Sequence, residues 1–309
     1  MVRILGNIVG AVFAGVLLLA FGGTVKDYFS EPPLPSVSEE FHLEPEHLAL
    51  SSDGPFGKYD KAQLQRGLQI YHEVCSGCHS LNRVAFRDLK DLGYNEAQVK
   101  NFAAQFEVPD VNPDTGEPAL RKALPSDYFP SPYANETAAR AANNNAVPPD
   151  LSLITKSREG GASYVHALLT GYRDPKTYKN EKGEPLPKEG MPASATLHFN
   201  PYFANLNLAM PAPLNSDGQV TYAPGNPKPT VNQMASDIAA FLVWTAEPKL
   251  ENRHRAGIAV LIFLIIATAL GYLSYQNVWA EAKRKVAPVG PLDPENKAKR
   301  TRATAKARD

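Results

Sequence analysis

The sequence has little cysteine and no net charge. Only two of its 309 residues are cysteine, and 32 lysines and arginines balance 32 acidic residues. Two cysteines exclude the dense disulfide network of a small secreted scaffold. A net charge of zero removes the electrostatic basis for nucleic-acid binding, so we expect no nucleic-acid partner. Because 43% of the residues are hydrophobic and only 21% are charged, global disorder is excluded and one or two folded domains are expected.

A long apolar run lies near the N-terminus. Residues 4–25 follow Arg3 and contain no charged side chain, and a helix of this length can cross a bilayer. The same arrangement is typical of an export signal, although the candidate cleavage motif at residues 20–22, Ala-Phe-Gly, is weak. We therefore predict that residues 1–25 are either a signal sequence or an N-terminal membrane anchor. Either alternative exports the chain that follows.

A second apolar run, residues 257–275, lies near the C-terminus and ends in an aromatic belt. It predicts a transmembrane helix over residues 256–279, with a buried core helix as the alternative. The tail, residues 280–309, is rich in lysine and arginine, which the positive-inside rule assigns to the cytoplasm. Residues 26–255 are then expected to be a periplasmic domain on a bacterial inner (cytoplasmic) membrane, so the lipid bilayer is a predicted partner.

Helical periodicity appears in three segments between the apolar runs. A helix is predicted over residues 61–74, a short one over residues 162–170 between glycines, and one that starts at a capping-box pattern in residues 230–233. We expect the first and the last to pack together. Residues 108–149, rich in proline and asparagine, are expected to form turns and short elements.

The N-terminal acidic stretch of the exported part, residues 30–60, is called the acidic lead below. It has seven carboxylates and a single lysine after residue 30, which predicts a solvated linker. Residues 176–191 form a second long polar stretch, and the sequence assigns no role to it.

The chemistry is concentrated at residues 75–79, Cys-Ser-Gly-Cys-His. C-x-x-C-H is the attachment signature of a c-type haem, in which Cys75 and Cys78 form thioethers and His79 is the proximal ligand of the iron. A redox dithiol and half of a zinc site are the alternatives. A thioredoxin-like motif would follow a strand, whereas here a helix precedes it, and the other histidines lie at no metal-ligand spacing from the motif. We expect one covalently attached haem c.

A haem iron has a second axial position, which a distant part of the chain must supply. The exported candidates are the sulfurs of Met191, Met210 and Met234, or a histidine. Met234 lies on the apolar face of the last predicted helix, which favours a core position. Met191 and Met210 each precede a proline, and spacing alone leaves both open. Methionine ligation raises the reduction potential, as suits an electron carrier.

Several motifs, in order along the chain, closely resemble the cytochrome c1 family, the haem-bearing subunits of quinol:cytochrome c oxidoreductase. The resemblance covers residues 59–275, ends in a single C-terminal anchor, and rests on residues 75–79, 126–130, 138–144, 148–152, 168–172 and 199–203, with Met210 seven residues further on. It implies that Met210 is the second axial ligand. It also implies that Arg158 lies near the haem propionates and that the haem pocket includes Asn143, Pro149, Tyr164, Leu168, Phe203, Leu208 and Pro213.

The resemblance implies a mainly α fold: a class I cytochrome c-like haem domain with long loop insertions, a C-terminal transmembrane helix and an N-terminal apolar segment. The implied function is to pass one electron from the Rieske iron–sulfur subunit to a soluble or membrane-anchored c-type cytochrome, without a bond-making catalytic site of its own. Cytochrome b would be the other partner, in a dimeric complex.

Charge alone suggests where a basic electron acceptor docks. The two candidate surfaces are the acidic lead and a patch that comprises Glu107, Asp110, Asp114 and Glu117. Two other functions remain open at this stage. One is a membrane-anchored cytochrome subunit of a different respiratory enzyme, and the other is a thiol redox protein that uses Cys75 and Cys78.

Overall fold

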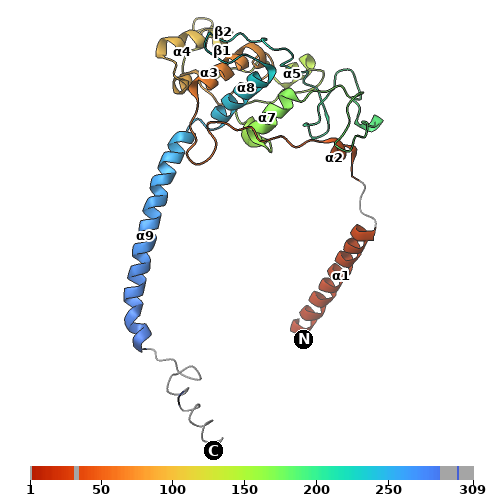
Figure 1. Cartoon of the computed structure of the whole chain (residues 1–309), viewed down its shortest axis with the longest axis vertical. Helices are drawn as coiled ribbons and strands as arrows, with labels where there is room; N and C mark the ends of the chain where they lie inside the picture. Colours follow the sequence, from red (N-terminus) through yellow and green to blue (C-terminus); the bar gives the residue numbers. More distant parts are fainter. Residues whose placement is uncertain (1, 31–34, 286–297, 299–309) are drawn as a thin grey trace, which may run out of the picture. The chain divides into compact units, whose positions relative to one another are not determined.

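Helices make up most of the regular structure of the chain (Figure 1). The computed structural model describes residues 2–30, 35–285 and 298, so most of the basic tail predicted at residues 280–309 lies outside the described residues. The chain divides into one unit of Met1–Ser52 with Tyr59–Pro248, and a second of Asp53–Lys58 with Lys249–Asp309. The mainly α fold predicted from the sequence is confirmed.

Two helices cross at the centre of the first unit. Helix α3 (Lys61–Ile70) is capped by Asp60, whose carboxylate accepts from the backbone nitrogen of Ala62 at 2.9 Å. It packs against α8 (Val231–Ala246), as predicted, and the closest approach is at Gly67, where an added Cβ would lie 2.3 Å from the carbonyl oxygen of Asp237. The buried Asp237 carboxylate also binds the Arg66 guanidinium through two contacts, of 2.8 and 3.0 Å.

The end of the first predicted helix is wider than an α-helix. After Ile70 the chain forms a π-helical turn, η1 (Tyr71–Cys75), and Ser76 N donates to the Tyr71 carbonyl oxygen at 2.8 Å. Tyr71 is buried, and its hydroxyl donates to the carbonyl oxygen of His79 at 2.9 Å. This bond satisfies a buried phenol and ties the π-turn to the end of the cysteine motif.

Helix α7 (Gly161–Thr170) confirms the short helix predicted from the sequence, and it lies against α8 (Figure 1). The capping box predicted at the start of α8 is only half formed. Thr230 Oγ1 accepts from Gln233 N at 3.1 Å, but the Gln233 side chain donates to Asp237 at 2.9 Å instead of returning to Thr230. The buried carboxylate of Asp237 competes successfully for that amide because a charged acceptor forms a stronger hydrogen bond.

The main core lies around the α3 and α8 crossing. Met234 is fully buried there, as predicted. Four phenylalanines form an aromatic group with Tyr71. Phe86 lies in η2 (Phe86–Leu92), Phe102 in α4 (Glu96–Ala103) and Phe106 just after α4, and Phe129 lies further along the chain. Three further short helices are α5 (Glu136–Ala142), α6 (Ile154–Ser157) and η3 (Lys188–Gly190).

Two small antiparallel hairpins interrupt the helical fold. Strand β1 (Glu107–Val111) pairs with β2 (Pro118–Lys122), so the turns and short elements predicted for residues 108–149 include most of a regular hairpin. Strand β3 (His198–Phe199) pairs with β4 (Asn207–Leu208), with His198 opposite Leu208. The second hairpin ends two residues before Met210.

Residues 35–52 of the acidic lead are not a solvated linker, which corrects the prediction for that part of the stretch. It contains a short helix, α2 (Val37–Phe41), and Phe41 and Leu50 are only 3% and 8% exposed. Leu43 N donates to the Pro201 carbonyl oxygen at 2.9 Å, and Leu48 N donates to Ser163 Oγ at 3.0 Å. The prediction considered the net charge of the stretch and not the apolar residues between its carboxylates. Burial of those apolar residues holds the segment against the domain.

A second, smaller core holds the acidic lead in place. Phe41 packs with Leu186, Phe199 and Leu206, and the partly buried Met191 joins this group. Leu186 and Met191 belong to residues 176–191, the polar stretch without a predicted role. That stretch therefore contributes apolar contacts that hold α2 against the β3–β4 hairpin.

Two described helices are long and apolar enough to cross a membrane. They are α1 (Val2–Ser30), with a candidate span of Arg3–Ser30, and α9 (Leu250–Lys285), with a candidate span of Leu250–Ala280. None of the side chains in the most apolar part of either helix is buried. Length and composition alone identify them, and α9 contains the transmembrane segment predicted at residues 256–279.

Candidate haem-binding site

The cysteine motif is a tight turn around one carbonyl group. Cys75 ends the π-turn η1, and its carbonyl oxygen accepts from Cys78 N at 3.1 Å and from His79 N at 2.9 Å. Both thiols are free, and Cys78 is exposed. Burial, with a smaller contribution from Cys78, raises the pKa of the Cys75 thiol to about 12. Reactive redox thiols have lowered pKa values, so the environment of Cys75 disfavours the thiol redox alternative.

The imidazole of His79 is oriented by a contact with a backbone carbonyl. Its Nδ1 lies 2.7 Å from the carbonyl oxygen of Pro149, and because a carbonyl oxygen only accepts, Nδ1 carries the hydrogen. The lone pair is then on Nε2, the atom left to bind iron. Burial lowers the pKa of His79, opposed by the Pro149 carbonyl and the Asp150 carboxylate, and so favours the neutral, ligating form. These residues fit a c-type haem.

The segment that carries Met210 is tied to the end of α7. The fully buried Asn200 donates from Nδ2 to the Leu168 carbonyl oxygen at 2.8 Å. The hydroxyl of Tyr172, just after α7, donates to the Met210 carbonyl oxygen at 3.0 Å. An added Cβ at Gly171 would lie 2.4 Å from the Tyr202 ring, so this close approach requires glycine. The backbone of Met210 is thereby held.

The other predicted pocket residues come from four parts of the chain. Tyr164 and Leu168 are partly buried on α7, Phe203 lies in the turn between β3 and β4, and Leu208 is buried in β4. Pro213 follows Met210, and its carbonyl oxygen accepts from Gln219 Nε2 at 2.7 Å. The structure thus brings Leu168 together with the loop that leads to Met210.

Asn143 and Arg158 lie at the ends of short helices. Asn143 is the C-cap of α5, and its Nδ2 donates to the Ala139 carbonyl oxygen at 2.7 Å. Arg158 is exposed at the C-cap of α6 and close to Tyr164: burial raises the pKa of Tyr164, and the Arg158 guanidinium opposes that rise. An exposed guanidinium has several donors, so Arg158 can bond Tyr164 and also pair with a carboxylate such as a haem propionate.

The two methionines that spacing left open lie in different environments. Met191 packs against the small core formed by Phe41, Leu186, Phe199 and Leu206. Met210 follows the β3–β4 hairpin and is fixed through its backbone by Tyr172. The apolar packing of Met191 accounts for its side chain without a ligand role, and this supports Met210 as the axial ligand.

Three residues with positioning roles are missing from the sequence prediction. They are Asp150, Tyr172 and Asn200, and each lies within a motif that carries the family resemblance. Asp150 accepts three hydrogen bonds, from Ser80, Asn82 and Ser152. The motifs signalled that these positions matter, but only the tertiary contacts show what each side chain holds.

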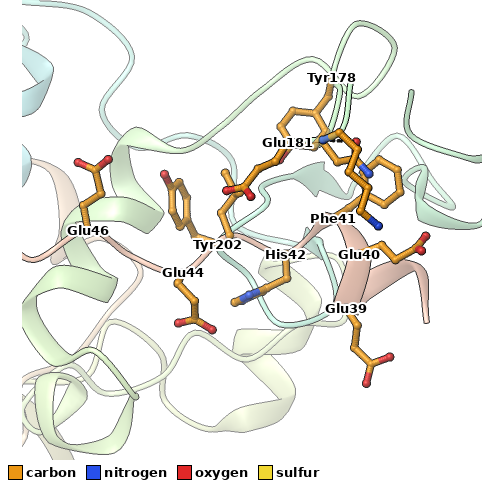
Figure 2. A pocket seen from close by; sticks show the side chains of 12 residues that line it. Glu39, Glu40, Phe41, His42, Glu44, Glu46, Tyr178, Glu181 and Tyr202 are labelled. Atoms are coloured by element: carbon orange, nitrogen blue, oxygen red, sulfur yellow. Dashed lines mark hydrogen bonds between the residues drawn. The ribbon is translucent and has the colours of Figure 1, made fainter. Parts of the chain in front are cut away.

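A separate, acidic cavity lies beside the acidic lead. Its volume is about 560 Å³, and Tyr178, Lys182 and Tyr202 line it together with much of residues 39–46. Figure 2 shows the carboxylates of Glu39, Glu40, Glu44 and Glu46 carried along this one segment, with Glu181 contributed by the 176–191 stretch. The cavity is therefore a concentration of negative charge, formed where the two sequence stretches meet.

Comparison with known proteins identifies the family. The sequence model of the Cytochrome C1 family matches residues 50–282. The chain is 45% identical over 250 residues to a cytochrome b/c1 of Bradyrhizobium diazoefficiens, with 74% of this chain and 34% of that protein covered. It therefore spans about a third of the length of that relative.

Two further relatives are matched over most of their length. The chain is 42% identical over 239 residues to the cytochrome c1 of Rhodospirillum rubrum, covering 74% of this chain and 85% of that protein. It is also 42% identical over 246 residues to the mitochondrial cytochrome c1 heme protein of Saccharomyces cerevisiae, covering 80% and 75% respectively. Together with the geometry at His79 these matches settle the family and its cofactor: the chain is a haem protein that belongs to the cytochrome c1 family.

Proposed function

We propose that this chain is the electron-transfer subunit of a quinol:cytochrome c oxidoreductase, and that it passes single electrons from a Rieske iron–sulfur protein to a c-type cytochrome. The observation that carries the proposal is the orientation of His79 by the Pro149 carbonyl, next to two free cysteines at haem-attachment spacing. The names of the relatives, cytochrome b/c1 and cytochrome c1, support membership of such a complex.

In this proposal the haem supplies a one-electron couple, and the chain supplies its fixed surroundings. Cys75 and Cys78 would hold the group covalently, and the Nε2 atom of His79 and the sulfur of Met210 would be its axial ligands. Tyr172 holds the Met210 backbone and so limits the movement of that ligand. Rigid ligands reduce reorganisation during electron transfer, and a filled axial pair excludes oxygen and peroxide from the iron.

The proposed membrane arrangement follows from the apolar helices. Helix α9 would anchor the domain beside cytochrome b, with residues 26–255 in the periplasm, residues 256–279 in the bilayer and residues 280–309 in the cytoplasm. Two apolar helices and relatives named for the b/c1 complex indicate membrane association. The orientation rests on the basic residues of the tail, and residues 1–25 would be a signal sequence or a second anchor.

Haem analysis of the intact assembly tests the proposal. The chain is purified in mild detergent through a tag, and a pyridine haemochrome spectrum reports c-type and b-type haem together. We expect both signals, with b in excess of c, because cytochrome b should accompany the chain. A c signal alone would argue for a cytochrome subunit of a different enzyme. Absence of both would return Cys75 and Cys78 to thiol chemistry.

We further propose that a basic acceptor docks on the acidic lead and not on the hairpin patch, the carboxylates Glu107, Asp110, Asp114 and Glu117 on and between β1 and β2. In the hairpin patch, Asp110 pairs with Arg121 at 2.7 Å, and Lys122 directly follows Arg121 in the sequence, so basic side chains offset part of the negative charge. Among the described residues, Glu40, Glu44 and Glu46 of the acidic lead form no ion pair that would neutralise them. Unpaired surface carboxylates produce the longer-ranged field that steers a charged partner.

Charge-neutralising variants compare the two surfaces. The triple variant Glu40→Gln, Glu44→Gln, Glu46→Gln should slow association with a basic c-type cytochrome by about tenfold at low salt and flatten the dependence on ionic strength. The control, Asp114→Asn with Glu117→Gln, should leave the association rate and its dependence on ionic strength nearly unchanged. Stopped-flow kinetics over a salt series provides the measurement. The reverse pattern would assign docking to the hairpin patch.

A further inference from the structure

The carboxylate of Asp150 is the centre of a hydrogen-bond network next to the proximal histidine. Its Oδ2 accepts from Ser80 Oγ and from Asn82 N, both at 2.7 Å, and its Oδ1 accepts from Ser152 N at 2.9 Å. Asp150 directly follows Pro149, the residue whose carbonyl oxygen binds His79 Nδ1. Ser80 directly follows His79. The carboxylate therefore joins the two residues adjacent to the His79–Pro149 contact.

Further bonds join the same two segments. Leu151 N donates to the Ser80 carbonyl oxygen at 2.9 Å, and Arg83 N donates to Ser152 Oγ at 3.1 Å. With the bonds to Asp150 they form a ladder between residues 79–83 and 149–152. About 70 residues separate the segments in the sequence, so their alignment has to be maintained by contacts of this kind. Among the groups that form these bonds, only the Asp150 carboxylate is charged, since Arg83 takes part through its backbone nitrogen. Hydrogen bonds to a charged acceptor are stronger than those to a neutral one.

The position of Pro149 has a chemical consequence at His79. A carbonyl oxygen that accepts from Nδ1 makes the imidazole a better electron donor through Nε2. A stronger donor stabilises oxidised iron relative to reduced iron and lowers the reduction potential. The negative charge of the Asp150 carboxylate, which accepts from Ser80 next to His79, acts in the same direction. Asp150 contributes to both effects, since it anchors Pro149 and carries the charge.

We propose that Asp150 is a positioning residue for the proximal ligand: it holds the Pro149 carbonyl against His79 Nδ1 and thereby lowers the reduction potential of the haem. This inference rests on the proposed role of His79 as the iron ligand. The three donors to the carboxylate, Ser80 Oγ, Asn82 N and Ser152 N, set the orientation of Asp150.

The test uses the full-length protein in its membrane complex. Asp150→Asn removes the charge but keeps the shape, and it should raise the midpoint potential in a spectroelectrochemical titration and shift the EPR g-values of the oxidised protein. Asp150→Glu keeps the charge and displaces it by one methylene, so its midpoint should lie between those of the wild type and Asp150→Asn. The matched control is Asp127→Asn, since the Asp127 carboxylate also anchors a loop, through Leu124 N at 2.7 Å and Arg121, and these partners lie outside the ladder.

The outcomes separate the inference from the proposed function. Unchanged midpoint and g-values in Asp150→Asn, with haem still attached, would overturn the positioning role, as would an equal rise in Asp127→Asn. If Asp150→Asn fails to assemble, Ser80→Ala decides: it removes one donor to the carboxylate and should shift the g-values, and unchanged g-values would refute the proposal. Lack of covalent haem in the wild type would defeat the proposed function itself.

Discussion

The two candidate axial methionines show how single residues can be distinguished by their surroundings. Met191 and Met210 both precede proline, so local sequence does not distinguish them. Their environments do: Met191 lies against an apolar group, whereas Met210 is held through its backbone by Tyr172. A side chain already used in packing is poorly placed to bind a metal as well.

Met210→Leu should therefore change the potential and leave haem attachment intact. Leucine fills a similar volume but offers no sulfur, so the midpoint should fall by an amount on the order of 0.2 V, part of the roughly 0.8 V range that axial ligands span. A redox titration followed at the haem absorption band measures the change, and haem staining on a denaturing gel checks attachment. Met191→Leu is the control and should keep the wild-type midpoint. The opposite result would make Met191 the ligand.

At the scale of elements, the crossing of α3 and α8 is the contact on which the stability of the haem domain depends most directly. At Gly67 the α3 backbone approaches the Asp237 carbonyl oxygen and the Phe241 Cβ so closely that an added methyl group would lie 2.3 and 2.4 Å from them. One of these atoms belongs to the backbone of α8 and cannot rotate away. Both helices are connected with the candidate haem site. Helix α3 runs into the π-turn that ends at Cys75, and α8 packs against α7.

Gly67→Ala is expected to destabilise the domain by about 3 kcal/mol, because the two helices have to separate to admit the Cβ. Thermal unfolding of the haem-loaded protein, followed by circular dichroism, gives the difference. Ala62→Gly is the matched control: it exchanges the same methyl group at an exposed position of α3 and should cost about 1 kcal/mol through helix propensity. Equal losses in the two variants would contradict the role of the crossing.

For the whole molecule, the question is whether the haem domain depends on the membrane helices. The main core is formed by buried residues between Leu50 and Trp244, and the smaller core by residues between Phe41 and Leu206. Both sets lie within residues 35–248 and outside α1 and α9. The apolar side chains needed to fold the domain are thus contained in that part of the chain.

Residues 35–248, exported behind a cleavable signal, should therefore fold as a soluble protein with covalent haem. Cell fractionation and the absorption spectrum of the soluble fraction measure this result. A longer variant, residues 35–285, restores α9 and should remain in the membrane fraction. Soluble protein without haem, or a short variant retained in the membrane, would show that the anchor takes part in folding or attachment.

Much of the helical framework and of the proximal site follows from local pattern. The periodicity of residues 61–74, the glycines around residues 162–170 and the cysteine spacing with its adjacent histidine are short-range signals, and the structure bears out the helices they predict. The acidic lead was predicted wrongly because its composition is dominated by carboxylates. A few apolar side chains, Phe41 and Leu50 among them, determine its position through burial.

The sequence by itself determined the haem motif, the apolar helices and the family, since each depends on residues that are close together or occur in a recognisable order. Only the tertiary structure decided which groups orient those residues. Pro149 meets His79, Tyr172 meets Met210, and Asp150 meets Ser80 across long intervals of sequence. The physical reason is that hydrogen bonds and burial act over a few ångströms in space, and the packing of α3, α7 and α8 brings distant segments within that range.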